Sequence, residues 1–400
     1  MASYGACGFG PGAGIAGGRL SMANPRTPTL CPIPLSPLPD KPLVSVLMSN
    51  YNYGHYVTQA IESVLAQTYP HFELVICDDG STDNSRRIIR KYTQRDPRVT
   101  LVVKPNGGQA SGFNAAFRRS KGAIICFLDA DDTAVLRRLE VLVDAFRSNP
   151  DAGLVLSPTL YVDEKRRQRG VSPLLASMPT GWTAEAAIAG GGVLPYMPGT
   201  SGLNLRSETA RRVFPLPESQ PLSMCPDMLL GRLAPLVTSI ATVAEPLVAL
   251  RLHGDNTYTR GRISVRSLDR ELELCRHLWQ AQRKFLAGID PELARKLKPW
   301  EHNGYALVMR YMRARLAGDP ASPIWHKMLL DAIASRPDEH RLAGFWKASI
   351  HLPRPLFWVA INLLMTHNAL KAVVARWKGA ETVPYPMRGK RSNAEPQAKS

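Results

Sequence analysis

Three aspartates within four residues, Asp129, Asp131 and Asp132, have the clearest capacity for chemistry in this 400-residue chain. They directly follow the apolar run 123–128, which has the length of a buried strand. Carboxylates this close together repel one another and are costly unless a cation neutralises them. Mg²⁺ and Mn²⁺ prefer carboxylate and phosphate oxygens, so the cluster predicts a divalent ion that bridges two phosphates. The alternative is an acidic first turn of a helix, which accounts for Asp132 but not for Asp129.

A second polar segment, residues 78–83, reads Asp-Asp-Gly-Ser-Thr-Asp and also follows an apolar run. A turn with a helix cap would explain Gly80, Ser81 and Asp83, whereas the pair Asp78-Asp79 exceeds what a cap needs. A carboxylate at a strand end can accept a hydrogen bond from a base N–H or a ribose hydroxyl. Residues 106–112 could cradle an anion with their small side chains, but they match neither a P-loop nor a dinucleotide fingerprint, and a plain loop is an equal reading.

The elements that position these residues alternate between strands and helices. Strand-length apolar runs occupy residues 43–49, 72–77, 99–104 and 123–128, and helical periodicity occupies residues 56–67, 83–95, 108–120 and 137–148. This alternation predicts an α/β fold: a Rossmann-like, mostly parallel sheet with helices on both faces. Ligands bind beyond the carboxyl ends of such strands, so we expect residues 49–52, 78–81 and 129–132 to meet in one carboxylate-rich crevice.

The rest of the chain is divided as follows. A Gly/Pro-rich leader, residues 1–41, and a basic tail, residues 380–400, are expected to be disordered. The α/β domain is placed at 42–262 and an α-helical extension at 263–379. Within the α/β domain, Gly190–Gly192 and residues 195–200 are interpreted as flexible active-site loops. Within the helical extension, helices are expected at 267–286, 291–317, 323–335 and 339–350.

The net charge of +17 implies anionic partners, but it is spread along the chain, which argues against nucleic acid. The six cysteines form no CxxC pair, so neither a zinc site nor a redox motif is indicated. The sequence has neither a recognisable signal peptide nor a run of about 20 apolar residues. The apolar run 356–365 is interpreted as a core helix, with an interfacial membrane helix as the alternative.

Five motifs in this order resemble one family. Residues 44–52, 67–69, 73–83, 106–108 and 129–132 look like the GT-A family 2 glycosyltransferases, and the resemblance covers residues 42–150. It implies a nucleotide-binding α/β domain and inversion at the anomeric carbon of the sugar. It also places Ser49 and Tyr51 beside base and ribose, makes Asp79 an acceptor from the base, and makes Asp129 and Asp131 the DxD pair, with Asp131 nearest the metal.

Two downstream segments also resemble the family. Asp227 would be the general base at the start of a helix, although Pro226 replaces the acid that usually precedes it; the alternative is an acidic residue that only stabilises the helix start. In residues 250–257, Arg251 would offset diphosphate charge and His253 would ligate the metal or contact phosphate. The alternative for His253 is a purely structural histidine.

The function implied is metal-dependent transfer, with Mn²⁺ or Mg²⁺, from a nucleotide diphosphate sugar to a saccharide or lipid-linked acceptor. The resemblance also implies a role in cell-surface polysaccharide or glycolipid synthesis. The protein is expected in the cytoplasm, and peripheral contact with the inner membrane face is left open. A binding or scaffold protein that keeps the pocket without transfer activity is the alternative, and a nucleic-acid-binding protein is the reading least supported.

Overall fold

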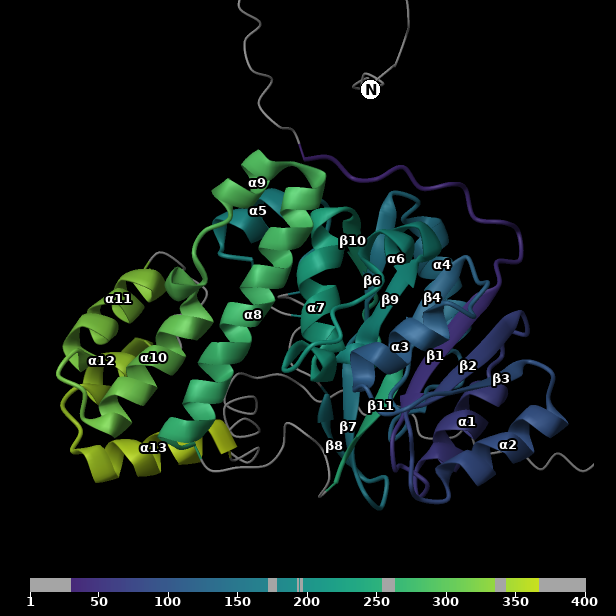
Figure 1. Cartoon of the computed structure of the whole chain (residues 1–400), viewed down its shortest axis with the longest axis horizontal. Coiled ribbons are helices and arrows are strands. Elements are labelled where there is room, and N and C mark those ends of the chain that lie inside the picture. The colour runs from purple at the N-terminus through teal and green to yellow at the C-terminus, as the bar shows by residue number, and fades with distance from the viewer. Residues whose placement is uncertain are drawn as a thin grey trace, which may run out of the picture.

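The computed structural model describes residues 30–171, 178–192, 194, 197–253, 263–334 and 343–366. In these residues the strands form two sheets, of order β10-β6-β9-β4-β1-β2-β3 and β5-β11-β7-β8 (Figure 1). The larger sheet contains β1 Val44–Asn50, β2 Phe72–Asp78, β3 Val99–Val103, β4 Ile124–Phe127, β6 Ala152–Leu156, β9 Leu203–Arg206 and β10 Ser239–Thr242. The smaller contains β5 Thr133–Ala134, β7 Thr159–Asp163, β8 Gln168–Val171 and β11 Val248–Leu252.

The larger sheet is mostly parallel, which confirms the predicted fold class. Strand β1 pairs in parallel with β2 and β4, β2 with β3, and β6 with β10. Strand β9 is antiparallel to both of its neighbours, β4 and β6. The carboxyl ends of β1, β2 and β4 therefore lie along one edge, as the crevice requires.

Helices cover both faces of this sheet because successive side chains of a strand point to opposite sides. Leu47 of β1 belongs to a core that includes Phe113 of α3 (Gln109–Phe117). Val46 and Met48 belong to a second core on the opposite face. Its helices are α1 (Val57–Leu65), α2 (Ser85–Arg95) and α4 (Arg138–Ser148). The predicted helices thus form, although each begins or ends one to three residues inside its predicted range.

The smaller sheet was not predicted. Strand β5 begins directly after Asp132 and pairs antiparallel with β11, which runs parallel to β7. Its strands are short, and β8 is largely exposed, so they carry little hydrophobic alternation. The sheet matters for the site because it lays Arg251 of β11 beside the acidic turn.

The chain after residue 262 is helical, as expected. Its helices are α8 Val265–Ile289, α9 Pro291–Lys296, α10 Gly304–Ala317, α11 Ser322–Ala334, α12 Ala343–Ser349 and α13 Arg354–Thr366. The single helix predicted at 291–317 is wrong: α9 ends at Lys296, and α10 begins only at Gly304. Pro299 explains the break, because proline disfavours helical backbone at the residue before it. Among the described helices, none combines the length and the hydropathy needed to cross a bilayer.

Helix α8 also packs against α7 (Pro226–Leu233) of the α/β domain. The side chain of Gln282, which is fully buried, donates from Nε2 to the carbonyl of Arg232 at 3.1 Å. Arg232 in turn donates to the carbonyl of Gly192 at 3.3 Å. These contacts place Gly192 against α7 and α8. The interpretation of Gly190–Gly192 as an active-site loop stays a prediction; in residues 195–200, Pro195 and Tyr196 lie outside the described residues.

The described part of the leader is not disordered, contrary to expectation. Leu30 is buried, and the amide of Ile33 donates to the carbonyl of Val237 at 2.8 Å. The amide of Ser36 donates to Glu208 at 3.2 Å. Backbone hydrogen bonds and one buried side chain thus tie residues 30–36 to the domain. Residues 1–29 and 380–400 lie outside the described residues.

Candidate functional site

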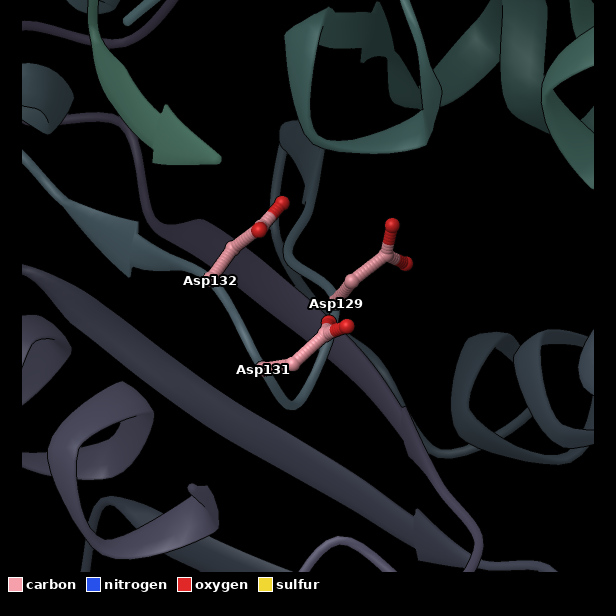
Figure 2. Close-up of side chains that lie close together, drawn as sticks. All are labelled: Asp129, Asp131 and Asp132. Atoms are coloured by element: carbon pink, nitrogen blue, oxygen red, sulfur yellow. The ribbon is translucent and has the colours of Figure 1, made fainter. Parts of the chain in front are cut away.

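The acidic residues lie in the turn between β4 and β5, at the carboxyl edge of the parallel sheet. Figure 2 shows Asp129, Asp131 and Asp132 gathered around this turn. One carboxylate oxygen from each lies within 4.8 Å of the others. Three oxygen ligands at this spacing suit a hard divalent cation such as Mg²⁺ or Mn²⁺.

Asp132 ties the turn to two other elements. Its carboxylate accepts from the Ser201 hydroxyl at 2.7 Å and from the Arg251 amide at 3.1 Å. The Ser201 oxygen also accepts from the backbone amide of Asp129 at 3.0 Å. The interpretation of Asp132 as a cap of the next helix is therefore wrong: β5 follows it, and α4 begins only at Arg138.

A fully buried arginine lies behind the turn. Nη2 of Arg138 donates to the carbonyls of Phe127 at 2.7 Å and Ser201 at 2.9 Å, and to Oδ1 of Asn204 at 3.2 Å. Its charge lowers the pKa of Asp132, opposing the larger effect of burial. Arg138 thus supplies an internal counter-charge and fixes the segment that carries Ser201.

Arg251 lies in β11, and His253 is the residue directly after this strand. Both side chains approach the acidic turn, as the resemblance implies. Nε2 of His253 lies 3.0 Å from Oδ2 of Asp131. Nε of Arg251 donates to the carbonyl of Asp131 at 3.0 Å, and its Nη2 donates to Gln59 at 2.6 Å. The ring of Tyr56 lies against both, 4.6 Å from the His253 ring and 5.1 Å from the Arg251 guanidinium. His253 would add one nitrogen donor to three carboxylates, whose oxygens are the ligands that Mg²⁺ and Mn²⁺ prefer.

Asp79 has a different set of partners from the base acceptor expected. Its carboxylate accepts from Nζ of Lys104 at 2.5 Å, from the Gly107 amide at 3.1 Å and from the Gly108 amide at 2.8 Å. Only 1% of the residue is exposed. In this conformation Asp79 holds the loop before α3 in place.

Asp78 and two asparagines shape the neighbouring turn. Asp78 accepts from the Ser81 amide at 3.1 Å and from the guanidinium of Arg86 at 3.1 Å. Asn52, which has a left-handed backbone (φ 59°), accepts from the Thr82 amide at 2.8 Å. Asn50 donates to both Asp78 and Ser81. The turn is thereby bound to the end of β1.

The two residues expected beside base and ribose differ in exposure. Ser49 is buried at the end of β1, whereas Tyr51 is 45% exposed. A Cβ on Gly112 would lie 2.2 Å from the Ser49 hydroxyl. Only glycine therefore lets α3 approach the end of β1 this closely.

Asp227 lies in the first turn of α7, as predicted, after Pro226 at the first helical position. Burial raises the pKa of its carboxyl. Its charge also contributes to raising the pKa of Asp129, so the two carboxylates are close enough to interact. Asp227 thus lies within electrostatic reach of the acidic turn.

Sequence reasoning missed four residues whose hydrogen bonds organise the site: Ser201, Arg138, Lys104 and Gln109. Nε2 of Gln109 donates to the Asp129 carboxylate at 2.7 Å. Gln109 lay within the motif read as a loop opening a helix, which was a usable signal. Ser201 and Arg138 carried none, because their partners are distant in sequence or are backbone atoms.

Burial and mutual repulsion alter how the acidic turn titrates. Burial, with charge from Asp132, Asp131 and Asp227, raises the pKa of Asp129 well above its ordinary value. Burial and Asp131 raise the pKa of Asp132 to about 8. The folded chain therefore holds these protons more tightly than the unfolded chain. Their contribution to stability is present below the unfolded pKa near 4 and is lost as pH rises through about 8.

We therefore expect the melting temperature without metal to fall between pH 5.5 and 8. Protons and a divalent cation compete for the same oxygens, so the stabilisation by Mg²⁺ should grow over the same range. Differential scanning fluorimetry with and without Mg²⁺ at each pH checks both trends. Asp132→Asn should flatten the fall that occurs without metal, and a Mg²⁺ shift that is equal at all pH values would contradict the assignment.

Comparison with known proteins bears on the same segment. Residues 45–208 match the model described as "Glycosyl transferase family 2". An uncharacterized glycosyltransferase of a Nostoc species is 33% identical over 216 residues, which cover 54% of this chain and 66% of that protein. UDP-Glc:alpha-D-GlcNAc-diphosphoundecaprenol beta-1,3-glucosyltransferase WfgD of Escherichia coli is 37% identical over 111 residues, 28% of this chain and 43% of that protein.

The alignment thus spans less than two thirds of either relative. Among solved structures, S. aureus TarS 1–349 in complex with UDP aligns with a TM-score of 0.49 and 18% identity, covering 82% of this chain and 91% of that one.

The sheet order and the acidic turn after β4 define a GT-A type of α/β domain. The matched segment, residues 45–208, is similar to glycosyl transferase family 2.

Proposed function

We propose that this protein is an inverting glycosyltransferase that moves a sugar from a nucleotide diphosphate sugar to a hydroxyl acceptor. One observation carries the proposal: a turn of three carboxylates, with His253 3.0 Å from Asp131, stands at the carboxyl edge of a parallel sheet near a separate carboxylate, Asp227. Metal-bridged diphosphate and a general base are the two groups that direct displacement needs.

The side chains divide into donor-binding and proton-transfer roles. Asp129, Asp131 and His253 would hold Mn²⁺ or Mg²⁺, which neutralises the charge that develops on the leaving diphosphate. Arg251 adds a second positive charge beside the same turn. Ser49 and Tyr51 would contact base and ribose. Asp79 would accept from the base only after exchanging one of its bonds to Lys104, Gly107 or Gly108.

Asp227 would take the proton of the acceptor hydroxyl. As that oxygen attacks the anomeric carbon, the bond from this carbon to the diphosphate oxygen breaks, and the nucleoside diphosphate leaves with the bonding electrons. Attack from the face opposite the leaving group inverts the configuration. The raised pKa of Asp227 makes its carboxylate a stronger base than an exposed aspartate.

The acceptor is proposed to be a saccharide or a lipid-linked saccharide of cell-surface polysaccharide or glycolipid synthesis. The name of the E. coli relative, which includes a diphosphoundecaprenol acceptor, supports this class. Cytoplasmic location with peripheral contact at the inner membrane face follows from such an acceptor. Residues 42–262 would form the transferase domain and 263–379 its helical extension.

A nucleotide screen tests the proposal. UDP, GDP and TDP are each added to the purified chain with and without Mn²⁺, and melting temperature is measured; one of them is expected to stabilise the protein only with the metal. Equal melting temperatures under all conditions would overturn the proposal. Metal-dependent binding without product from any matching nucleotide sugar would favour the scaffold alternative, for which Pro226 at the position of the usual acid is the supporting feature.

A further inference from the structure

The last described helix, α13, has one buried face and one exposed apolar face. Phe357 and Ile361 are fully buried in the core of the helical extension. Leu356 and Val359, on the other side, are 57% and 44% exposed. Exposure of Leu and Val side chains to water is unfavourable. A helix with one buried face and one exposed apolar face is typical of a helix that lies on an apolar or interfacial partner.

Helix α2 presents a row of cations. Arg87, Arg90 and Lys91 are exposed and follow the i, i+3, i+4 spacing of one helix face. They line a groove of about 420 Å³, together with Arg86, Gln94, Ser81 and one carboxylate, Asp83. Among the described residues, no carboxylate lies within 4.0 Å of the three cations. Their charge is therefore available to an external anion.

The hairpin that joins β7 and β8 carries a second group of cations. Lys165, Arg166, Arg167 and Arg169 are all exposed. Asp163 pairs with Arg167 at 2.7 Å and with Arg169 at 2.6 Å. Lys165 and Arg166, at the tip, have no such partner among the residues that the structure describes.

These three elements lie along one margin of the molecule as Figure 1 draws it. Figure 1 shows α13, the β7–β8 strands and α2 along its lower margin. Their connections agree: Asp163 at the end of β7 is opposite Leu252 of β11. Ile263, eleven residues after Leu252, accepts at its carbonyl from Trp358 of α13 and donates from its amide to Asn362.

We propose that this margin docks on an anionic lipid surface, with Leu356 and Val359 entering the headgroup boundary and the cations of α2 and the hairpin binding lipid phosphates. Exposed apolar side chains and exposed cations along one margin match a charged bilayer surface, whereas binding to a polyanionic glycan would leave the exposed Leu and Val without an apolar partner. The proposal rests on the peripheral membrane contact included in the proposed function, and it places that contact on the side where β11 leads into His253.

Vesicle flotation of the full chain tests the proposal. Binding is expected to phosphatidylglycerol-containing vesicles and not to phosphatidylcholine alone. Each surface cation contributes about a five-fold factor to partitioning at low salt. The variant Arg87→Gln/Arg90→Gln/Lys91→Gln should therefore lose at least about ten-fold. Leu356→Ser/Val359→Ser should weaken the binding that remains in 0.5 M salt.

A matched control removes three exposed arginines elsewhere: Arg119→Gln/Arg211→Gln/Arg212→Gln. It should bind vesicles as the unchanged protein does. An equal loss in both triple variants would mean that net charge alone drives binding, and absence of binding to anionic vesicles would equally overturn the proposal. None of these residues contacts the acidic turn, so the metal-dependent nucleotide shift should survive in every variant; loss of that shift in the unchanged protein would count against the proposed function only.

Discussion

Replacing Asp131 with alanine is expected to abolish metal-dependent nucleotide binding and to lower transfer by about 10²–10³-fold or more, the usual cost of losing one electrostatic contact to a leaving group. Oδ2 of Asp131 lies 3.0 Å from Nε2 of His253, and Asp131 shares the turn with two other carboxylates. Asp131 therefore connects the histidine and the carboxylates of the proposed metal site. Isothermal titration with Mn²⁺ and nucleotide, followed by a product assay, measures both effects.

Stability separates this loss from simple unfolding. Alanine removes one of three mutually repelling carboxylates, so the metal-free melting temperature should hold or rise. The control Asp144→Ala removes an exposed carboxylate of α4 and should leave binding unchanged. Retention of the metal-dependent shift in Asp131→Ala would exclude Asp131 as a ligand.

Asp227→Asn is expected to separate binding from chemistry. The amide keeps the size of the side chain and its place in the first turn of α7, but it cannot accept a proton from the acceptor hydroxyl. Nucleotide affinity should stay within about two-fold, while kcat falls about 10²–10⁴-fold, the range that general base catalysis contributes. Single-turnover kinetics with a saturating donor report the chemical step directly.

The comparison variant is Glu185→Gln, which neutralises an exposed acid in the first turn of another short helix, α5 (Ala184–Ala189). It should retain full kcat. Unchanged kcat in Asp227→Asn would assign the base to another residue, whereas loss of nucleotide binding would mean that Asp227 belongs to the donor site.

Local patterns were enough to predict the parallel strands and the helices that cover them. Leu47 alternates with Val46 and Met48 along β1, so the sequence shows that both faces are buried. The acidic turn could be placed because it follows β4 directly. His253 beside Asp131 could be anticipated only through the family resemblance, since 122 residues separate the two.

The residues that hold the site in place could not be predicted from the sequence. They act through contacts between distant segments, and the sequence around them has no pattern that indicates such contacts. Ser201 reaches Asp132 from a short 3-10 helix, Thr200–Gly202, 69 residues away in the sequence. A buried Arg138 looks like any surface arginine at a helix start until its carbonyl partners are known. The same holds for Lys104, whose bond to Asp79 redirects a carboxylate that the motif alone assigned to a nucleobase.

The hydrogen bond from Gln282 to Arg232 has a practical consequence for dissecting the protein. Helix α7 carries the proposed base, and α8 packs against α7. A fragment ending at residue 262 would contain every motif of the transferase yet lack Leu274, Leu278 and Leu286 of α8, which belong to the same hydrophobic core as Leu230 and Leu233 of α7. A chimera in which residues 42–262 are exchanged would therefore also have to include α8 from the same protein.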